Sequence, residues 1–293
     1  MVGSFISLIR PFQWVKNVFV LVPLFFGGQL LNGVSWEEAL ITFAAFCFMA
    51  SAVYCLNDLC DIKADRRHPG KCSRPLASGR LKPANAVVLM LLMVLLSFAV
   101  NFSLNGDRAG KVAVVLLVYM ALNVAYCCKL KHYAIVDVFI IALGFVLRLV
   151  AGGVACDIWL SPWIVLMTFL IALFLAFAKR RDDVVLYEDD RIVTRKNVIR
   201  YNLPFMNQTL GLLGAITIVC YIMYSVSPEV TARFNHEYVY ATSIFVLAAI
   251  LRYLQVTMVD LRSGNPTTVL LHDRFIQLCV VLWMAYFFVI LYV

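Results

Sequence analysis

Nine long apolar stretches, separated by short polar segments, account for almost all of the sequence. A helix of about 20 apolar residues crosses the hydrocarbon core of a bilayer. Hydrophobic residues make up 63% of the chain and charged residues only 14%, which excludes a soluble globular domain. The sequence therefore predicts an all-α integral membrane protein with nine transmembrane helices, at residues 17–34, 37–56, 84–104, 112–128, 135–155, 160–178, 206–227, 238–258 and 275–293.

The basic residues between these stretches are distributed unevenly. If the N-terminus is cytoplasmic, 20 of the 25 Lys and Arg residues fall on the cytoplasmic side, 3 fall on the opposite side, and Arg148 and Arg252 fall within spans. Cytoplasmic loops carry an excess of Lys and Arg. We therefore expect a cytoplasmic N-terminus and cytoplasmic polar loops at 57–83 and 179–205. Membrane orientation and anionic lipid head groups explain the net charge of +8 without a nucleic-acid partner.

The two long polar loops are separated by four predicted spans. This spacing indicates a single polytopic membrane domain, 1–293, built from two four-helix halves at 17–128 and 135–258 and a final helix at 275–293. The pattern is compatible with a monomer and with a homo-oligomer.

The densest polar stretch, NDLCDIKADRRHPGKCSRPLASGRLK at 57–82, directly follows the second apolar run. Asp58, Asp61 and Asp65 are spaced by three and four residues, so a continued helix would place them on one face with Asn57. Their mutual repulsion would be relieved by Mg²⁺, which prefers oxygen ligands from one or two carboxylates and substrate phosphates. The neighbouring Lys and Arg residues suit the remaining phosphate oxygens. The pattern favours a magnesium–diphosphate site over a solvated loop whose charges serve only topology.

The segment RPFQWVKN at 10–17 has two interpretations. Trp14 and Lys16 are typical of an ordinary membrane entry. Alternatively, Lys16 and Asn17 cover the anionic site.

Arg148 is predicted to lie well inside a span. A charge at that depth costs a few kcal/mol on insertion scales, and such residues face the bundle interior or a wet cavity. Arg148 is therefore either a structural clamp paired with a carboxylate or a phosphate ligand. At the start of the last apolar run, Asp273 is expected to cap the helix.

These motifs together resemble the UbiA-type superfamily of intramembrane prenyltransferases, whose hallmark is NDxxDxxxD after the second helix. Within it, the chain is similar to the branch of decaprenyl-phosphate phosphoribosyltransferases. The stretches that carry the resemblance are RPFQWVKN at 10–17, NDLCDIKADRRHPGKCSRPLASG at 57–79, YCCKLKHYAIVDV at 126–138, GFVLRLVAGG at 144–153, AKRRDD at 178–183 and PTTVLLHDRF at 266–275.

The resemblance implies helices around a central cavity, a bacterial inner-membrane location and Mg²⁺ dependence. It also implies transfer of phosphoribose from phosphoribosyl pyrophosphate to a polyprenyl phosphate. Asp58, Asp61 and Asp65 would be catalytic and, with Asn57, would hold Mg²⁺ and the diphosphate. The other implied substrate ligands are Lys16, Asn17, Lys71, Arg74, Tyr126, Lys131, Arg148, Lys179, Arg180 and Asp183.

The second polar loop departs from the aromatic prenyltransferases of the superfamily. They carry two Asp residues four apart where this chain has KRRDD at 179–183, which argues against a second full metal site. A second cationic cluster suits two phosphorylated substrates whose mutual repulsion must be neutralised. Its bases would otherwise serve as positive-inside anchors.

Two other functions are compatible with the sequence. A prenyltransferase acting on an aromatic or other small acceptor would use the same Asp cluster for a polyprenyl diphosphate. A transporter of a phosphorylated solute would be expected to have broken helices at mid-membrane.

Overall fold

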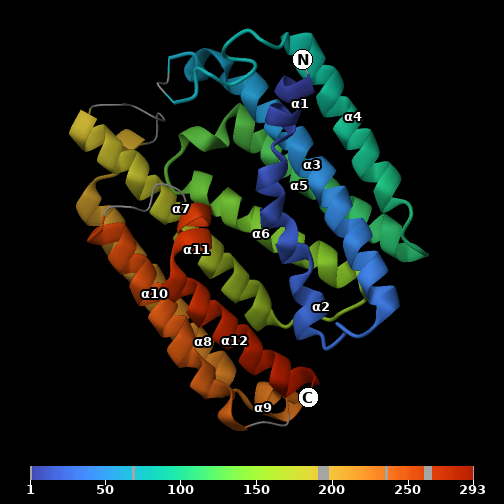
Figure 1. Cartoon of the computed structure of the whole chain (residues 1–293), viewed down its shortest axis with the longest axis vertical. Helices are drawn as coiled ribbons and strands as arrows, with labels where there is room; N and C mark the ends of the chain where they lie inside the picture. The colour runs from blue at the N-terminus through green and yellow to red at the C-terminus, as the bar shows by residue number, and fades with distance from the viewer. Residues whose placement is uncertain (1, 68–69, 191–197, 235–236, 261–265, 293) are drawn as a thin grey trace. The chain divides into compact units, whose positions relative to one another are not determined.

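The computed structural model describes residues 2–67, 70–190, 198–234, 237–260 and 266–292. All regular elements in these ranges are helices (Figure 1). Within them, nine helical segments are long and apolar enough to cross a membrane, which confirms the predicted fold class. The chain divides into two compact units, Met1–Leu160 and Ser161–Val293. The division of the membrane domain into four-helix halves stays a prediction.

The first unit is organised around α3, a helix of 33 residues. Lipid tails are as apolar as the helix surfaces, so close packing rather than release of water holds such helices together. Phe46 of α3 packs edge-on against Tyr119 of α5, with 5.3 Å between the ring centroids. The elements of this unit are α1 (Val2–Ile9), η1 (Pro11–Val20), α2 (Val22–Phe26), α3 (Gly33–Asp65), α4 (Pro83–Asn101), α5 (Asp107–Cys128), η2 (Leu130–His132) and α6 (Val136–Ala155).

The first membrane segment differs from the prediction of a helix at 17–34. It begins earlier and is broken into α1, η1 and α2. The break falls at Arg10, whose φ of 51° is left-handed, because the residue before a proline is disfavoured in the α conformation. The following 3₁₀ helix is unusually long, since such helices rarely exceed three or four residues. It lies directly on α6, where a Cβ at Gly152 would come within 1.9 Å of the Val20 carbonyl oxygen.

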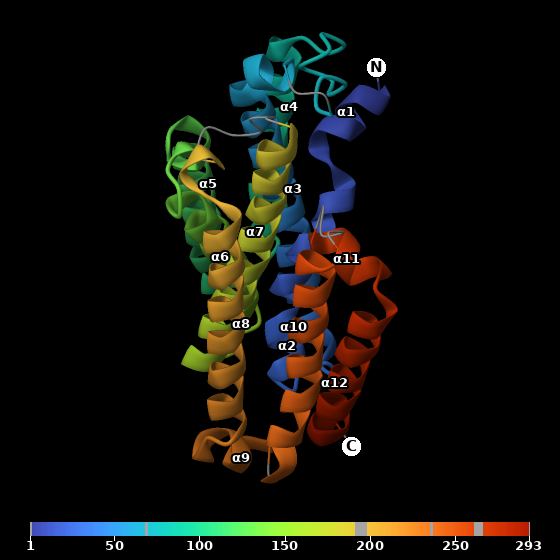
Figure 2. The same ribbon diagram turned by 90° about the vertical axis from the view of Figure 1, so that its left-hand side faces the viewer.

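The described part of the second unit contains four long helices, α7, α8, α10 and α12, in which α8 packs against α7 and α10, and α10 packs against α12 (Figures 1 and 2). Asp273 caps α12 by accepting a hydrogen bond from the Ile276 N–H at 3.0 Å, which confirms the expected cap. The elements are α7 (Pro162–Asp190), η3 (Val198–Arg200), α8 (Leu203–Ser225), α9 (Pro228–Phe234), η4 (Glu237–Thr242), α10 (Ser243–Met258), α11 (Pro266–His272) and α12 (Arg274–Tyr292).

Both predicted polar loops begin as helix. α3 continues to Asp65 and α7 to Asp190, so 57–65 and 179–190 extend the spans instead of starting the loops. The charged residues of 57–65 and 179–190 therefore lie on helices that continue from the apolar part of each span.

Candidate active site

The Asp-rich motif lies on the last turns of α3, and each of its three carboxylates is held by a cation. Asp58 Oδ1 accepts hydrogen bonds from Arg10 Nη2 at 2.5 Å and from Arg74 Nη1 at 3.2 Å. The same Arg74 nitrogen donates to Asp65 Oδ2 at 2.7 Å. Asp61 Oδ1 accepts from Lys131 Nζ at 2.5 Å. The last turns of α3 therefore carry all three carboxylates, and the protein's own cations balance their charge.

The three cations come from three different segments. Arg10 lies between α1 and η1, Arg74 lies in the turn after α3, and Lys131 belongs to η2. Leu76 and Leu81, on either side of a tight turn, are buried in a small core and anchor the segment that carries Arg74. The side chains of Asp58 and Asp65 are also buried. Removing one partner from a buried ion pair is costly, so these contacts order all three segments.

The donor set fits Mg²⁺. Asp58, Asp61 and Asp65 supply hard carboxylate oxygens on one helix face, and Mg²⁺ takes one or two carboxylates together with substrate phosphates. The carboxylates do not converge by themselves: among the described residues, no three acidic, Cys or His side chains lie close enough to bind a single metal ion. Asn57, predicted as a fourth ligand, accepts a hydrogen bond from Cys127 Sγ at 3.6 Å.

Arg148 is buried in the middle of α6, and it has neutral partners. Its Nε donates to Asn17 Oδ1 at 2.7 Å, its Nη1 to the Gly144 carbonyl at 2.7 Å, and its Nη2 to the Tyr119 hydroxyl at 3.0 Å. The guanidinium carbon also lies 4.9 Å from the centre of the Tyr119 ring and 5.4 Å from that of Phe145. One of the two roles predicted for Arg148 was an ion pair with a carboxylate. Arg148 forms no such pair with any residue that the structure describes.

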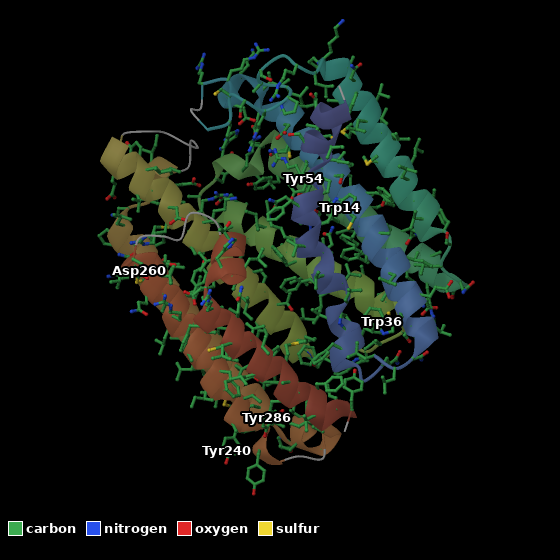
Figure 3. The ribbon with its side chains drawn as sticks, viewed as in Figure 1. Trp14, Trp36, Tyr54, Tyr240, Asp260 and Tyr286 are labelled. Atoms are coloured by element: carbon green, nitrogen blue, oxygen red, sulfur yellow. The ribbon has the colours of Figure 1, made fainter. Side chains whose placement is uncertain are left out.

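The segment 10–17 is part of the bundle rather than a simple membrane entry. Trp14, labelled beside α3 in Figure 3, donates through Nε1 to Ser51 Oγ at 3.0 Å. Asn17 is fully buried and donates to Cys47 Sγ at 3.2 Å. Lys16 is half-buried and lies within electrostatic range of Arg10 and Arg148. This segment therefore brings predicted substrate ligands into the interior of the first unit.

The remaining predicted ligands lie in three places. Lys71 is half-buried in the turn after α3, and Tyr126 is half-buried near the end of α5. In α7, Lys179 is exposed, whereas Arg180 is buried and donates to Asp183 Oδ2 at 2.8 Å. The α7 residues belong to the second unit, and their approach to the Asp cluster stays a prediction.

Two arginines make contacts that the sequence does not predict. Arg10 is part of the motif at 10–17 but is not among the predicted ligands, although its position before Pro11 marks a break in the helix. Arg181 belongs to the predicted cationic cluster at 179–183, but it is buried and donates to Asn207 Oδ1 at 2.7 Å and to the Thr257 carbonyl at 2.8 Å. It therefore ties α7 to α8 and α10.

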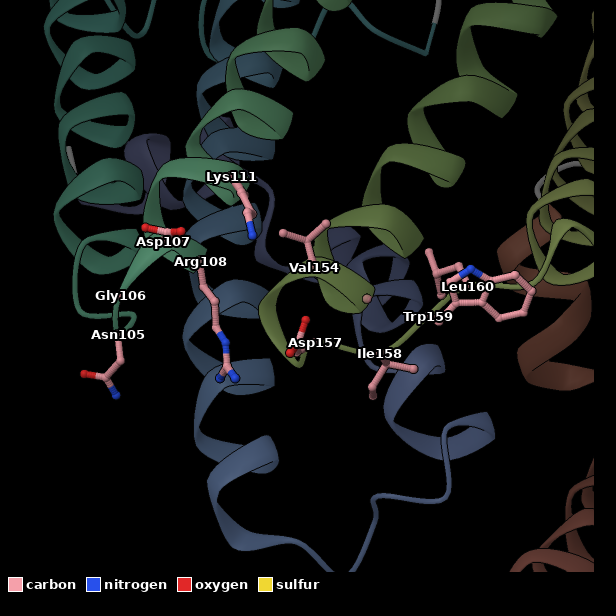
Figure 4. Close-up of a pocket in the computed structure, with 11 residues that line it drawn as sticks. Asn105, Gly106, Asp107, Arg108, Lys111, Val154, Asp157, Ile158, Trp159 and Leu160 are labelled. Carbon is pink, nitrogen blue, oxygen red and sulfur yellow. The ribbon is translucent and has the colours of Figure 1, made fainter. Parts of the chain in front are cut away.

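A cavity of about 810 Å³, lined by both charged and apolar side chains, lies elsewhere in the first unit (Figure 4). Asp107, Arg108 and Lys111 from the first turn of α5 line it, together with Asp157 and Trp159 after α6. These are the ends of α5 and α6 opposite to Lys131, about 30 Å away at 1.5 Å of rise per residue. The cavity is therefore separate from the Asp cluster.

The chain matches known proteins over nearly its full length. Residues 20–278 match the model of the UbiA prenyltransferase family. A decaprenyl-phosphate phosphoribosyltransferase from Mycolicibacterium smegmatis is 34% identical over 97% of this chain and 91% of its own. The corresponding protein from Corynebacterium glutamicum is 33% identical over 95% of this chain and 83% of its own.

The fold is similar to that of a solved structure. A UbiA homologue from Archaeoglobus fulgidus, bound to GPP and Mg²⁺, superimposes with a TM-score of 0.71 over 99% of this chain and 100% of that chain. The two sequences are 20% identical, so this likeness concerns the fold alone. On the family match, the relatives and the nine apolar helices, the chain is a multi-pass membrane protein that belongs to the UbiA prenyltransferase family.

Proposed function

We propose that the protein transfers 5-phosphoribose from phosphoribosyl pyrophosphate to a polyprenyl phosphate of decaprenyl-like length and releases pyrophosphate. The observation that carries the proposal is the set of three carboxylates on α3, each held by a cation from another segment. Such a set matches a ligand that carries both a metal ion and a diphosphate. The two relatives named for this reaction support the choice of substrates.

Asp58, Asp61 and Asp65 would hold Mg²⁺ on the diphosphate of the donor, with Asn57 beside them. The bound ion would neutralise the charge that develops on the leaving pyrophosphate. Arg10, Arg74 and Lys131, displaced from the carboxylates, would then donate to the remaining phosphate oxygens. Arginine suits this role because its guanidinium forms two parallel hydrogen bonds with phosphate.

In the reaction, the bond between C1 of the ribose and the pyrophosphate oxygen breaks, and its electron pair leaves with pyrophosphate. An oxygen of the lipid phosphate donates an electron pair to C1, through an oxocarbenium-like transition state. The acceptor is already an anion, so no side chain has to remove a proton. Catalysis then depends on holding the two substrates in line and on stabilising the leaving group.

Further parts of the chain would complete the site. Lys71 and Tyr126 in the first unit, and Lys179, Arg180 and Asp183 in the second, are proposed to contact the substrates. We place the protein in a bacterial inner membrane, as the family resemblance implies. The distribution of Lys and Arg supports an orientation with the N-terminus and the Asp cluster on the cytoplasmic side. The water-soluble donor would then enter from the cytoplasm and the lipid from the membrane.

One observation favours a transporter: the first membrane segment is broken at Arg10, and broken helices are expected in transporters. The Asp cluster, however, lies at the end of α3 and not midway along it. The enzymatic relatives span nearly the whole chain, so transport is not proposed.

The test is the transfer of label from ribose-labelled phosphoribosyl pyrophosphate to a lipid-extractable product, with purified protein, Mg²⁺ and a polyprenyl phosphate. We expect a labelled lipid that is lost with EDTA and in Asp61→Asn. Asp107→Asn is a matched control, because this exposed carboxylate lies at the opposite end of the unit. Absence of transfer with phosphoribosyl pyrophosphate, together with transfer from a polyprenyl diphosphate to an aromatic acceptor, would replace the proposal by prenyl transfer.

A further inference from the structure

The first unit holds a second group of cations, deeper in the bundle than Lys131. Arg148 lies 12 residues after Val136, the first residue of α6, which is about 18 Å along the helix axis. It is buried, and its partners are an amide, a carbonyl, a phenol and aromatic rings. These groups orient the guanidinium without neutralising its charge. A buried charge is usually paired with an opposite charge, and the residues that the structure describes provide none for Arg148.

Lys16 increases this excess of positive charge. It lies within electrostatic range of Arg148 and of Arg10, which are both cations. Among the described residues, Lys16 has no hydrogen bond and no ion pair. Arg10 is already held by Asp58, whereas Lys16 and Arg148 have no carboxylate partner in the described ranges of the chain. Like charges repel one another more strongly in a low-dielectric interior, and an anion between them would relieve this repulsion.

The surroundings hold both cations in place before any ligand binds. Trp14 fixes η1 to α3 through Ser51. Gly152, one turn beyond Arg148, allows η1 to lie against α6. Asn17 is fixed between Cys47 and Arg148 and therefore links the segment of Lys16 to the guanidinium. Preorganised donors of this kind lower the cost of binding a ligand.

We propose that Lys16 and Arg148 form a second anion subsite, separate from the Asp cluster, which binds a phosphate monoester dianion. Arg148 has five N–H groups, of which three are used, and Lys16 offers three more. The proposal rests on the proposed function for its two ligand sources, the phosphate of the polyprenyl acceptor and the 5-phosphate of the ribosyl donor. Both sources have the same chemistry and differ from the diphosphate assigned to Asp58, Asp61 and Asp65.

The experiment measures equilibrium binding without transfer. Purified protein in detergent is titrated with polyprenyl phosphate, with ribose 5-phosphate, and with pyrophosphate plus Mg²⁺, and neutral polyprenol serves as the uncharged counterpart of the lipid. In Lys16→Gln and Arg148→Gln we expect one of the two phosphate monoesters to bind about ten-fold more weakly or worse, with pyrophosphate binding retained. The affected monoester identifies the source. In Asp61→Asn we expect the reverse, which is weaker binding of pyrophosphate with Mg²⁺ and unchanged binding of both phosphate monoesters.

Unchanged affinity for both monoesters, or an equal loss for pyrophosphate, would overturn the subsite and leave a structural role. Arg148→Lys keeps the charge and should restore part of the lost affinity, which a role in packing alone would not predict. If Arg148→Gln does not fold, Lys16→Gln decides, because Lys16 makes no hydrogen bond to any residue that the structure describes. The outcome is distinct from that of the transfer assay: binding lost in Lys16→Gln without any phosphoribosyl transfer would support the subsite and reject the reaction.

Discussion

Arg74 Nη1 lies 2.7 Å from Asp65 Oδ2, so the turn after α3 folds back onto the last residue of that helix. The same nitrogen lies 3.2 Å from Asp58 Oδ1, two turns earlier. One guanidinium thus spans the length of the Asp motif and occupies the face where a metal–diphosphate would bind. On the proposed function, binding of the donor would exchange these contacts, and Arg74 would pass from the carboxylates to phosphate.

Arg74→Lys tests this exchange. The substitution retains the positive charge but removes the guanidinium that contacts both Asp58 and Asp65. An ammonium cannot form the parallel hydrogen bonds that a guanidinium forms with phosphate. Losing one charged hydrogen bond costs about 1.5–3 kcal/mol, or roughly ten-fold to a hundred-fold in affinity. We expect KM for the phosphoribosyl donor to rise by that factor and KM for the lipid to stay unchanged. Arg80→Lys, an exposed base in the same turn, is the control; an equal effect there would refute the assignment.

Gly152→Ala tests the contact between η1 and α6. The added Cβ would lie 1.9 Å from the Val20 carbonyl oxygen, a backbone atom that cannot rotate away. Overpacking of this kind costs about 1–3 kcal/mol, so Tm in detergent should fall. Gly110→Ala, on α5, adds a Cβ with nothing within 4 Å and should leave Tm unchanged or slightly raised. Equal Tm values for both variants would show that η1 does not depend on this approach.

The cap of α12 predicts a dependence on acid pH. Burial pushes the pKa of Asp273 upward, but hydrogen bonds from the Ile276 N–H and the Arg252 side chain outweigh it and lower the pKa below its ordinary value. The stabilisation is therefore complete above the pKa of the unfolded chain and is lost as the pH falls through the lower pKa of the folded protein.

Asp273→Asn keeps a capping oxygen and removes the charge. We expect a lower Tm than in the wild type near neutral pH and a smaller gap between the two proteins at strongly acid pH. A gap that is constant over this pH range would contradict the role of the Asp273 charge.

The sequence predicts the parts of the site that depend on local spacing. Asp58, Asp61 and Asp65 share a face because the helical repeat requires it, and the apolar run before them makes the helix long enough. Arg10 could not be identified in this way, because its contact with Asp58 depends on a left-handed backbone and on the packing of η1. The neutral surroundings of Arg148 could not be predicted either, since Asn17 and Tyr119 reach it from other segments. The apolar sequence around Arg148 indicates that this charge is buried, but only tertiary packing determines which groups contact it.

Phosphoribosyl transfer at the Asp cluster is tested most directly by an assay in which both substrates are labelled. Phosphoribosyl pyrophosphate carries one label in its ribose, and the polyprenyl phosphate carries another in its phosphorus. We expect a lipid product with both labels in equal amounts, formed only with Mg²⁺ and with Asp58, Asp61 and Asp65 intact. A product that has lost the phosphorus of the lipid, or one that never acquires the ribose label, would contradict phosphoribosyl transfer at the Asp cluster.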